Sequence, residues 1–205
     1  MPVPEFGPGE VLVKVDSVSI CGSDPGIINK GWQGYTPLGE FIPGHEFAGV
    51  VAATAPDVTR LKVGDRVSVE PHKGCGRCEN CLRGFYTTCL NYGKYEMGHR
   101  HFGFLTNGAY AEYAACHDTT LHKLPDNVSF EEGAVLTLVG TSMYGFERIG
   151  WVKPGETVVV LGPGAMGNVS AQIAKITGAG RVIMTGTREE RLEMGRKVGV
   201  DITIN

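Results

Sequence analysis

The sequence lacks a strong excess of charge, a long apolar run and a leader-like start. Its 205 residues carry 19 basic and 22 acidic side chains, and the net charge of -3 gives no electrostatic reason to bind nucleic acid or an anionic membrane. No apolar stretch approaches the roughly 18 residues of a membrane span. Residues 1–5 contain no basic segment followed by apolar residues. We therefore expect a soluble, cytoplasmic protein with no nucleic acid or membrane partner.

Internal repeats and low-complexity tracts are also missing, whereas glycine is abundant. The 30 glycines are about double the usual share of about 7%. Glycine is used where the backbone adopts positive φ or lies close to another group. This composition disfavours a helical bundle and favours a turn-rich β domain combined with a nucleotide-binding loop.

The first two-thirds of the chain have the pattern of β structure. Val11, Val13 and Val15 recur with the two-residue period of a half-buried strand. The segments 47–51, 65–69 and 109–115 are further strand candidates. The pattern changes near Ser129, which is placed to cap a helix.

The last third predicts alternating strands and helices. Strands are expected at 157–161, 181–185 and 201–204, with helices between them. The first helix has its apolar face on Met166, Val169, Ile173 and Ile176 and ends at Gly178 and Gly180, whereas the second covers 189–198. This β-α-β-α-β order is one half of a doubly wound parallel sheet. The second half does not follow, so we interpret the chain as a fragment.

Four of the six cysteines lie in one short segment. Two-residue gaps allow thiolates on a tight loop to converge on one ion, and a fourth thiolate closes the tetrahedron of a structural zinc site. An iron–sulfur cluster and free thiols are the alternatives, and the long last gap disfavours the spacing of bacterial ferredoxins. The expected ligands are Cys75, Cys78, Cys81 and Cys89.

A second metal site is indicated by Cys21 and by the adjacent pair His45 and Glu46. Thiolate, imidazole and carboxylate are the ligands of catalytic zinc, which keeps a position open for substrate. Zinc polarises an alcohol so that it loses its proton near neutral pH. Ser23 would relay that proton, and Asp24 would orient His45. Taken alone, a single cysteine is more typical of a buried thiol, and a His-Glu pair is more typical of the surface. The cysteine lobe and the nucleotide-binding loop in the same chain favour the metal site instead.

Residues 162–167 have the GxGxxG pattern between a predicted strand and a predicted helix. Gly162 makes the turn, Gly164 lets a pyrophosphate approach, and Gly167 permits close packing of helix and strand. Ala165 and Met166 complete the loop. In this context the motif predicts a dinucleotide site.

The end of the second predicted strand bears on the choice of cofactor. An NAD-type site has a carboxylate there, whereas this chain has Gly186, Thr187 and Arg188. Glycine leaves room, and Thr and Arg can bind a 2′-phosphate through charge-assisted hydrogen bonds. We therefore expect NADP rather than NAD. The alternative is that Arg188 is a solvated residue of the first helical turn.

These motifs together resemble one family, the zinc-containing medium-chain alcohol and polyol dehydrogenases. The fold implied is α/β plus β: a GroES-like β-rich catalytic domain over 1–150, with a structural zinc lobe at about 72–92, and a partial Rossmann doubly wound parallel sheet over 151–205. The resemblance further implies zinc on Cys21, His45 and Glu46, a proton relay beginning at Ser23, Met166 near the nicotinamide, and a homodimer or homotetramer. The matching segments are Cys21–Asp24, Gly44–Glu46, Val63–Val67, Cys75–Cys89, Gly108–Tyr113 and Gly162–Gly167.

The chain departs from this family at three points. Thr137 stands in segment 134–139, where relatives usually supply another zinc ligand or an acidic group. A first N-terminal strand and the closing C-terminal parts are also missing. Three hypotheses remain: a zinc oxidoreductase that transfers hydride between a secondary alcohol, sugar or polyol and NADP or NAD; a zinc-free quinone or enoyl-type reductase; and a non-catalytic, zinc-stabilised binding fragment.

Two further features lie outside these motifs. The aromatic and basic segment 92–104 either shapes a pocket or is a solvated loop, and the loop is favoured. Cys116 is expected to be buried and inert.

Overall fold

The computed structural model describes residues 2–31 and 41–205. The chain divides into two compact units, Met1–Thr137 and Leu138–Asn205. Helix α4 (Leu136–Arg148) starts just before this division, and its Phe146 packs into the hydrophobic core of the second unit. Each unit is described by itself.

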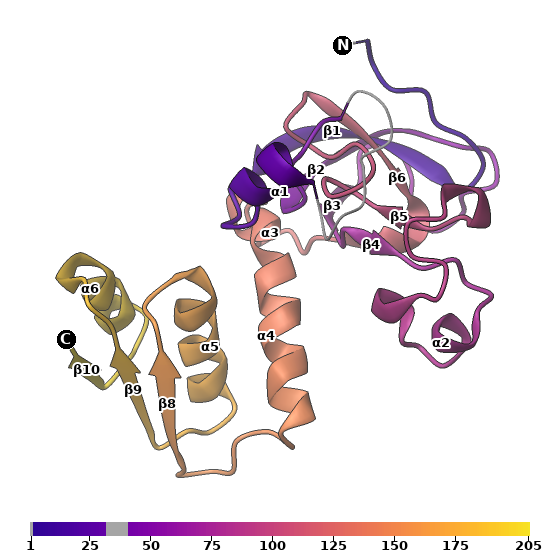
Figure 1. The fold of residues 1–205 in the computed structure, drawn as a ribbon. Helices are drawn as coiled ribbons and strands as arrows, with labels where there is room; N and C mark the ends of the chain where they lie inside the picture. The colour runs from indigo at the N-terminus through magenta and orange to yellow at the C-terminus, as the bar shows by residue number, and fades with distance from the viewer. Residues whose placement is uncertain (1, 32–40) are drawn as a thin grey trace. The chain divides into compact units, whose positions relative to one another are not determined.

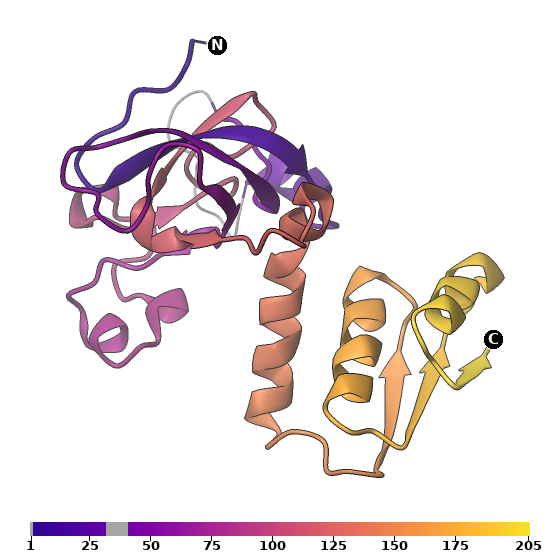
Figure 2. The same ribbon diagram turned by 180° about the vertical axis from the view of Figure 1, so that it is seen from behind.

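The first unit is built on a curled antiparallel sheet with the strand order β6-β1-β2-β3-β7 (Figures 1 and 2). Register shifts within β1 between Leu12 and Val13 and between Val15 and Ser17 mark irregularities that bend the strand. The expected strand at 109–115 begins only at Tyr113. The strands are β1 (Glu10–Val18), β2 (Phe47–Thr54), β3 (Arg66–Val69), β6 (Tyr113–His117) and β7 (Leu121–Lys123).

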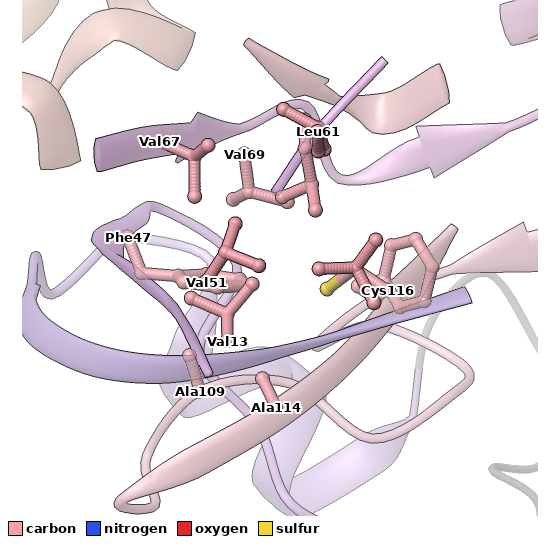
Figure 3. Packing of buried hydrophobic residues seen from close by; sticks show 12 residues of the cluster. Val13, Phe47, Val51, Leu61, Val67, Val69, Ala109, Ala114 and Cys116 are labelled. Atoms are coloured by element: carbon pink, nitrogen blue, oxygen red, sulfur yellow. The ribbon is translucent and has the colours of Figure 1, made fainter. Parts of the chain in front are cut away.

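The concave side of this sheet holds the core of the first unit. Side chains of Val67 and Val69 point toward those of Val13 and Val51 (Figure 3). Burying each such side chain stabilises the fold by about 1.5–3 kcal/mol. Cys116 lies in the same cluster with no exposed surface, and burial raises the pKa of its thiol, so its predicted burial is confirmed.

Short helices and a two-stranded ribbon complete the first unit. Ser129 caps α3 with a reciprocal capping box to Glu132, so the predicted helix start is confirmed. The remaining elements are α1 (Asp24–Lys30), β4 (His72–Lys73), α2 (Glu79–Leu82), η1 (Tyr86–Thr88), η2 (Tyr95–Met97), β5 (Arg100–His101), η3 (Asp118–Thr120) and α3 (Phe130–Ala134).

The favoured interpretation of residues 92–104 as a solvated loop is wrong. His99 has no exposed surface, and His101, Phe102 and Phe104 are buried. The ring of His101 stacks on that of Phe104 with 4.0 Å between centroids. The basic residues misled the prediction, because a histidine packed among aromatic rings is neutral and part of a core.

The second unit is a three-stranded parallel sheet in the order β10-β9-β8. Two helices connect the strands, which confirms the predicted β-α-β-α-β order (Figure 1). The elements are β8 (Thr157–Leu161), α5 (Ala165–Ile176), β9 (Arg181–Thr185), α6 (Glu189–Lys197) and β10 (Ile202–Ile204).

The core of the second unit differs from the expected apolar face of α5. Ile173 is buried as predicted, but Ile176 is 83% exposed, and the small residues Ala171 and Ala174 take the innermost positions. Small side chains let α5 approach the strands closely, so Val160 and Met184 can fill the space between. Among the described residues, no helix is long and apolar enough to cross a membrane.

Candidate metal centres and nucleotide loop

Cys21, His45 and Glu46 meet at one end of the antiparallel sheet. Val18, the last residue of β1, pairs with Phe47, the first residue of β2. The chain leaving β1 therefore lies beside the chain entering β2, and the backbone N–H of Ser19 donates to the carbonyl of Glu46 at 2.8 Å. One donor atom from each of the three side chains lies within 4.8 Å of the other two. The structure thus brings Cys21 to His45, which lies 24 positions later in the sequence, and to the adjacent Glu46.

The imidazole of His45 has its two nitrogens in different surroundings. Nε2 lies 3.9 Å from Glu46 Oε1, and Nδ1 lies 3.4 Å from Asp24 Oδ1. All three side chains are buried. Burial lowers the pKa of His45, although the charges of Asp24 and Glu46 act in the opposite direction. The lowered pKa favours the neutral ring, which is the form that binds a metal ion.

Hydroxyl groups hold the other two members of the cluster. Ser23 donates to Cys21 Sγ at 3.2 Å, and the hydroxyl of Ser19 donates to Glu46 Oε2 in a very short hydrogen bond. Thr137, the departure noted in the sequence, donates to the carbonyl of Val69 at 3.2 Å. Ser19 was missed in the sequence, because nothing in its spacing marks a serine that contacts a residue 27 positions away.

The donor set fits a zinc ion. Zinc bound by sulfur, nitrogen and oxygen at about 2.0–2.3 Å requires its tetrahedral ligands to lie about 3.3–3.8 Å apart. The observed 3.9 Å between His45 and Glu46 needs only a small movement of the side chains. Three protein ligands leave the fourth position open, as in catalytic zinc sites.

The four predicted lobe cysteines also converge. Cys75 Sγ lies 4.0 Å from Cys81 Sγ, and Cys78 Sγ lies 3.9 Å from Cys89 Sγ. A disulfide would require about 2.05 Å, whereas two sulfurs on one zinc ion lie about 3.8 Å apart. The lobe therefore has the separations of a tetrahedral thiolate site.

Hydrogen bonds inside the lobe favour the thiolate form of Cys75 and Cys78, whereas burial raises the pKa of Cys81 and Cys89. Burial raises the pKa of Cys75, but donors that include the backbone of Arg77 and the side chain of Asn91 outweigh it and bring the value to about 6. Burial raises the pKa of Cys81 to about 12. Four thiolates so close together repel one another, and a bound dication offsets that repulsion. The donor chemistry of the lobe thus fits zinc.

The GxGxxG segment connects β8 to α5, as its pattern requires. A Cβ atom on Gly167 would lie 2.0 Å from the carbonyl oxygen of Gly162, so only glycine fits where the helix begins against the strand. Gly164 is the residue before the first turn of α5, and a Cβ atom there would meet nothing within 4 Å. Ala165 starts α5, and Sδ of Met166 lies 4.0 Å from the hydroxyl of Ser142.

The end of β9 lies beside this loop. A Cβ atom on Gly186 would lie 2.6 Å from Pro163 Cγ, so the residue after β9 contacts the glycine loop. Thr187 follows, and Arg188 is the residue before the first turn of α6. The neighbouring Glu189 is paired with Arg196 at 2.6 Å.

Comparisons with known proteins place this geometry in one family. Residues 7–126 match the alcohol dehydrogenase GroES-like domain. The chain is 36% identical over 203 residues to an alcohol dehydrogenase of Geobacillus stearothermophilus, covering 98% of this chain and 58% of that protein. It is 37% identical over 210 residues to the sorbitol dehydrogenase of Bacillus subtilis, covering 100% of this chain and 56% of that protein.

A solved structure agrees with the sequence relatives. A protein of Sinorhizobium meliloti, assigned as a zinc-binding dehydrogenase and solved bound to NADP, superposes with a TM-score of 0.89 at 28% identity. The match covers 100% of this chain and 57% of that one. The chain thus spans well under two thirds of the length of the relatives it matches. By sequence and by fold, it belongs to the zinc-containing medium-chain dehydrogenase family.

Proposed function

We propose that this chain carries the metal-binding and part of the nucleotide-binding machinery of an NADP-dependent oxidoreductase that acts on a secondary alcohol, sugar or polyol. The observation that carries the proposal is the convergence of Cys21, His45 and Glu46 within 4.8 Å. The family relatives named above act on alcohol and sorbitol, by their names. A carbonyl compound is the corresponding substrate in the reductive direction.

Within this proposal each side chain has a defined task. Cys21, His45 and Glu46 hold a zinc ion, which when bound acts as a Lewis acid toward the substrate oxygen. Ser23 receives the hydroxyl proton and passes it on. The short distance from Ser23 Oγ to Cys21 Sγ, 3.2 Å, supports this task because it places the hydroxyl beside the metal ligand.

The second unit supplies the cofactor site. Gly162, Gly164, Ala165, Met166 and Gly167 would receive the pyrophosphate at the start of α5, where backbone N–H groups and the helix dipole favour an anion. Gly186, Thr187 and Arg188 would receive the 2′-phosphate of NADP. The adjacency of Gly186 and Pro163 supports a continuous binding surface.

The domain division and the assembly are part of the same proposal. We propose a GroES-like catalytic domain over residues 1–150, with the zinc lobe at about 72–92 held by Cys75, Cys78, Cys81 and Cys89; the compact units divide earlier, between Thr137 and Leu138. Residues 151–205 form the first half of the Rossmann domain. A cytoplasmic homodimer or homotetramer is the assembly that we propose, and sedimentation of the protein tests it.

One observation favours a second candidate, a zinc-free reductase of the same superfamily. Thr137 stands where a further ligand or acidic group is usual, and its hydroxyl is directed to the carbonyl of Val69. The cluster of Cys21, His45 and Glu46 weighs against this candidate, because a zinc-free site has no need for three metal-ligating side chains that converge, two of them buried.

Zinc content separates these candidates. We expect two zinc ions per chain, one of which is lost in Cys21→Ser. Cys116→Ser is the matched control, since Cys116 is a buried thiol in the sheet core, and it should keep both ions. Two ions in Cys21→Ser would exclude Cys21 as a ligand. Oxidation of alcohols that survives chelation would favour the zinc-free reductase, and failure to bind NADPH or NADH would favour a binding fragment.

A further inference from the structure

Tyr110 makes a hydrogen bond that the metal cluster does not itself explain. Its phenol oxygen lies 2.5 Å from Asp24 Oδ2. Asp24 is only 3% exposed, and an ionised carboxylate only accepts hydrogen bonds, so the phenol is the donor. Charge-assisted hydrogen bonds of this kind are short and strong. Tyr110 therefore holds the buried carboxylate of Asp24, which lies beside His45.

The two oxygens of Asp24 have separate partners. Oδ2 accepts from Tyr110 and, at 2.8 Å, from the backbone N–H of Cys21. Oδ1 lies 3.4 Å from His45 Nδ1 without hydrogen-bond geometry, and neither of these two atoms has a hydrogen-bond partner in the described part of the chain. Because Oδ2 is fully engaged, the carboxylate cannot rotate freely. Its remaining oxygen lies beside the imidazole, and both unpartnered atoms are buried.

The position of Tyr110 is fixed by its backbone rather than by its hydroxyl. Its N–H donates to the carbonyl of Pro43 at 3.0 Å, and the N–H of Ala109 donates to the carbonyl of Gly44 at 2.9 Å. A Cβ atom on Gly44 would lie 2.8 Å from Tyr110 Cδ1, so the ring rests on the residue just before His45. Removal of the hydroxyl alone should leave this packing intact.

We propose that Tyr110 is a positioning residue for the metal site formed by Cys21, His45 and Glu46. Its hydroxyl fixes Asp24, and Asp24 favours the proton of His45 on Nδ1, so that Nε2 would be free to bind a zinc ion. This inference rests on the metal site of the proposed function. Loss of such an outer partner typically weakens metal binding about 10- to 100-fold.

Metal affinity measured by chelator competition tests this role. Tyr110→Phe should weaken zinc binding at the Cys21 site about 10- to 100-fold and leave the lobe site unchanged. Tyr113→Phe removes the same group from a neighbouring tyrosine of β6 and should leave both affinities unchanged. The absorption spectrum of the cobalt-substituted protein should change in Tyr110→Phe, because the imidazole is no longer held in one orientation.

A double-mutant cycle with Asp24→Asn separates positioning from general loss of stability. If Tyr110 acts through Asp24, Tyr110→Phe should add little to the loss already caused by Asp24→Asn. Fully additive losses, or a Tyr110→Phe affinity within about twofold of wild type, would overturn the inference. If Tyr110→Phe fails in this way but Cys21→Ser still loses one zinc ion, only the role of Tyr110 is overturned and the proposed function stands. Wild-type protein that binds no metal at Cys21 would overturn both.

Discussion

The Nε2 atoms of His72 and His99 lie 3.2 Å apart in the interior of the first unit. His99 Nδ1 accepts from the backbone N–H of Gly93, so its Nε2 carries the proton and donates to His72. The ring of His72 also lies 5.6 Å from the ring of Tyr92, centroid to centroid. Neutral imidazoles thus connect the β4–β5 ribbon to the backbone at Gly93, which follows the last cysteine of the lobe. A second proton on this pair would place two N–H groups against each other.

Acid should therefore destabilise the first unit. Burial, followed by the charges of His72, Arg100 and Lys73, lowers the pKa of His99 from 6.5 to about 4. Because the unfolded chain then binds the proton more tightly, the stability contribution is present above pH 6.5 and is lost as the pH falls toward 4. The slope from one such group is at most about 1.4 kcal/mol per pH unit.

Urea unfolding of wild type and His99→Gln between pH 7.5 and 4.5 measures this contribution. The variant should show the smaller slope, whereas His122→Gln, a change at an exposed histidine, should match wild type. Loss of metal in acid acts on all three proteins, so the difference between slopes reports His99. Equal slopes in wild type and His99→Gln would contradict the lowered pKa of His99.

Cys89→Ser should remove the lobe zinc alone. A serine hydroxyl is a poor substitute for a thiolate, and the three remaining sulfurs cannot close the tetrahedron. Metal analysis should fall from about two zinc ions per chain to about one, and limited proteolysis should cut within residues 75–91. Cys21→Ser should lose the other ion and keep the lobe resistant. A visible absorption band from bound iron in the wild-type protein would show that the lobe holds an iron–sulfur cluster instead of zinc.

Gly164 and Gly167 should respond differently to alanine. Gly167→Ala forces a Cβ atom to within 2.0 Å of the Gly162 carbonyl, which should cost about 1–3 kcal/mol of stability. Gly164→Ala meets nothing in the protein, so it should leave thermal unfolding nearly unchanged but weaken NADPH binding, because the methyl group occupies the space of the pyrophosphate. Calorimetry and NADPH fluorescence measure the two effects. A Gly167→Ala variant as stable as wild type would show that the helix can shift.

Arg188→Ala tests the preference for NADP. Loss of a hydrogen bond to a charged phosphate costs about 1.5–3 kcal/mol, which is about 10- to 100-fold in affinity. NADPH binding should weaken by that factor while NADH binding changes little. Arg191→Ala, one turn along α6, should affect neither cofactor. Equal weakening of both cofactors by Arg188→Ala would leave no role for the 2′-phosphate.

Much of the second unit was predictable because its signals are local. The bounds of β8 and β9 match the expected 157–161 and 181–185. The signals for strand, glycine loop and helix follow one another directly in the sequence, so they can be recognised without knowledge of distant contacts. The buried face of α5 was less predictable. Whether Ile176 or Ala174 faces the sheet depends on how closely helix and strands approach, which a helical period alone does not specify.

For the candidate sites, the sequence determined which residue types were available and how the four lobe cysteines were spaced. It also indicated that Cys21, His45 and Glu46 would act together, because the same chain contains the cysteine lobe and the GxGxxG loop. Only the tertiary structure decided what surrounds them. The pairing of Val18 with Phe47 brings Ser19 to Glu46, and the segment before β6 brings Tyr110 to Asp24. Such contacts arise from sheet register between distant segments, and neither spacing nor composition encodes register directly.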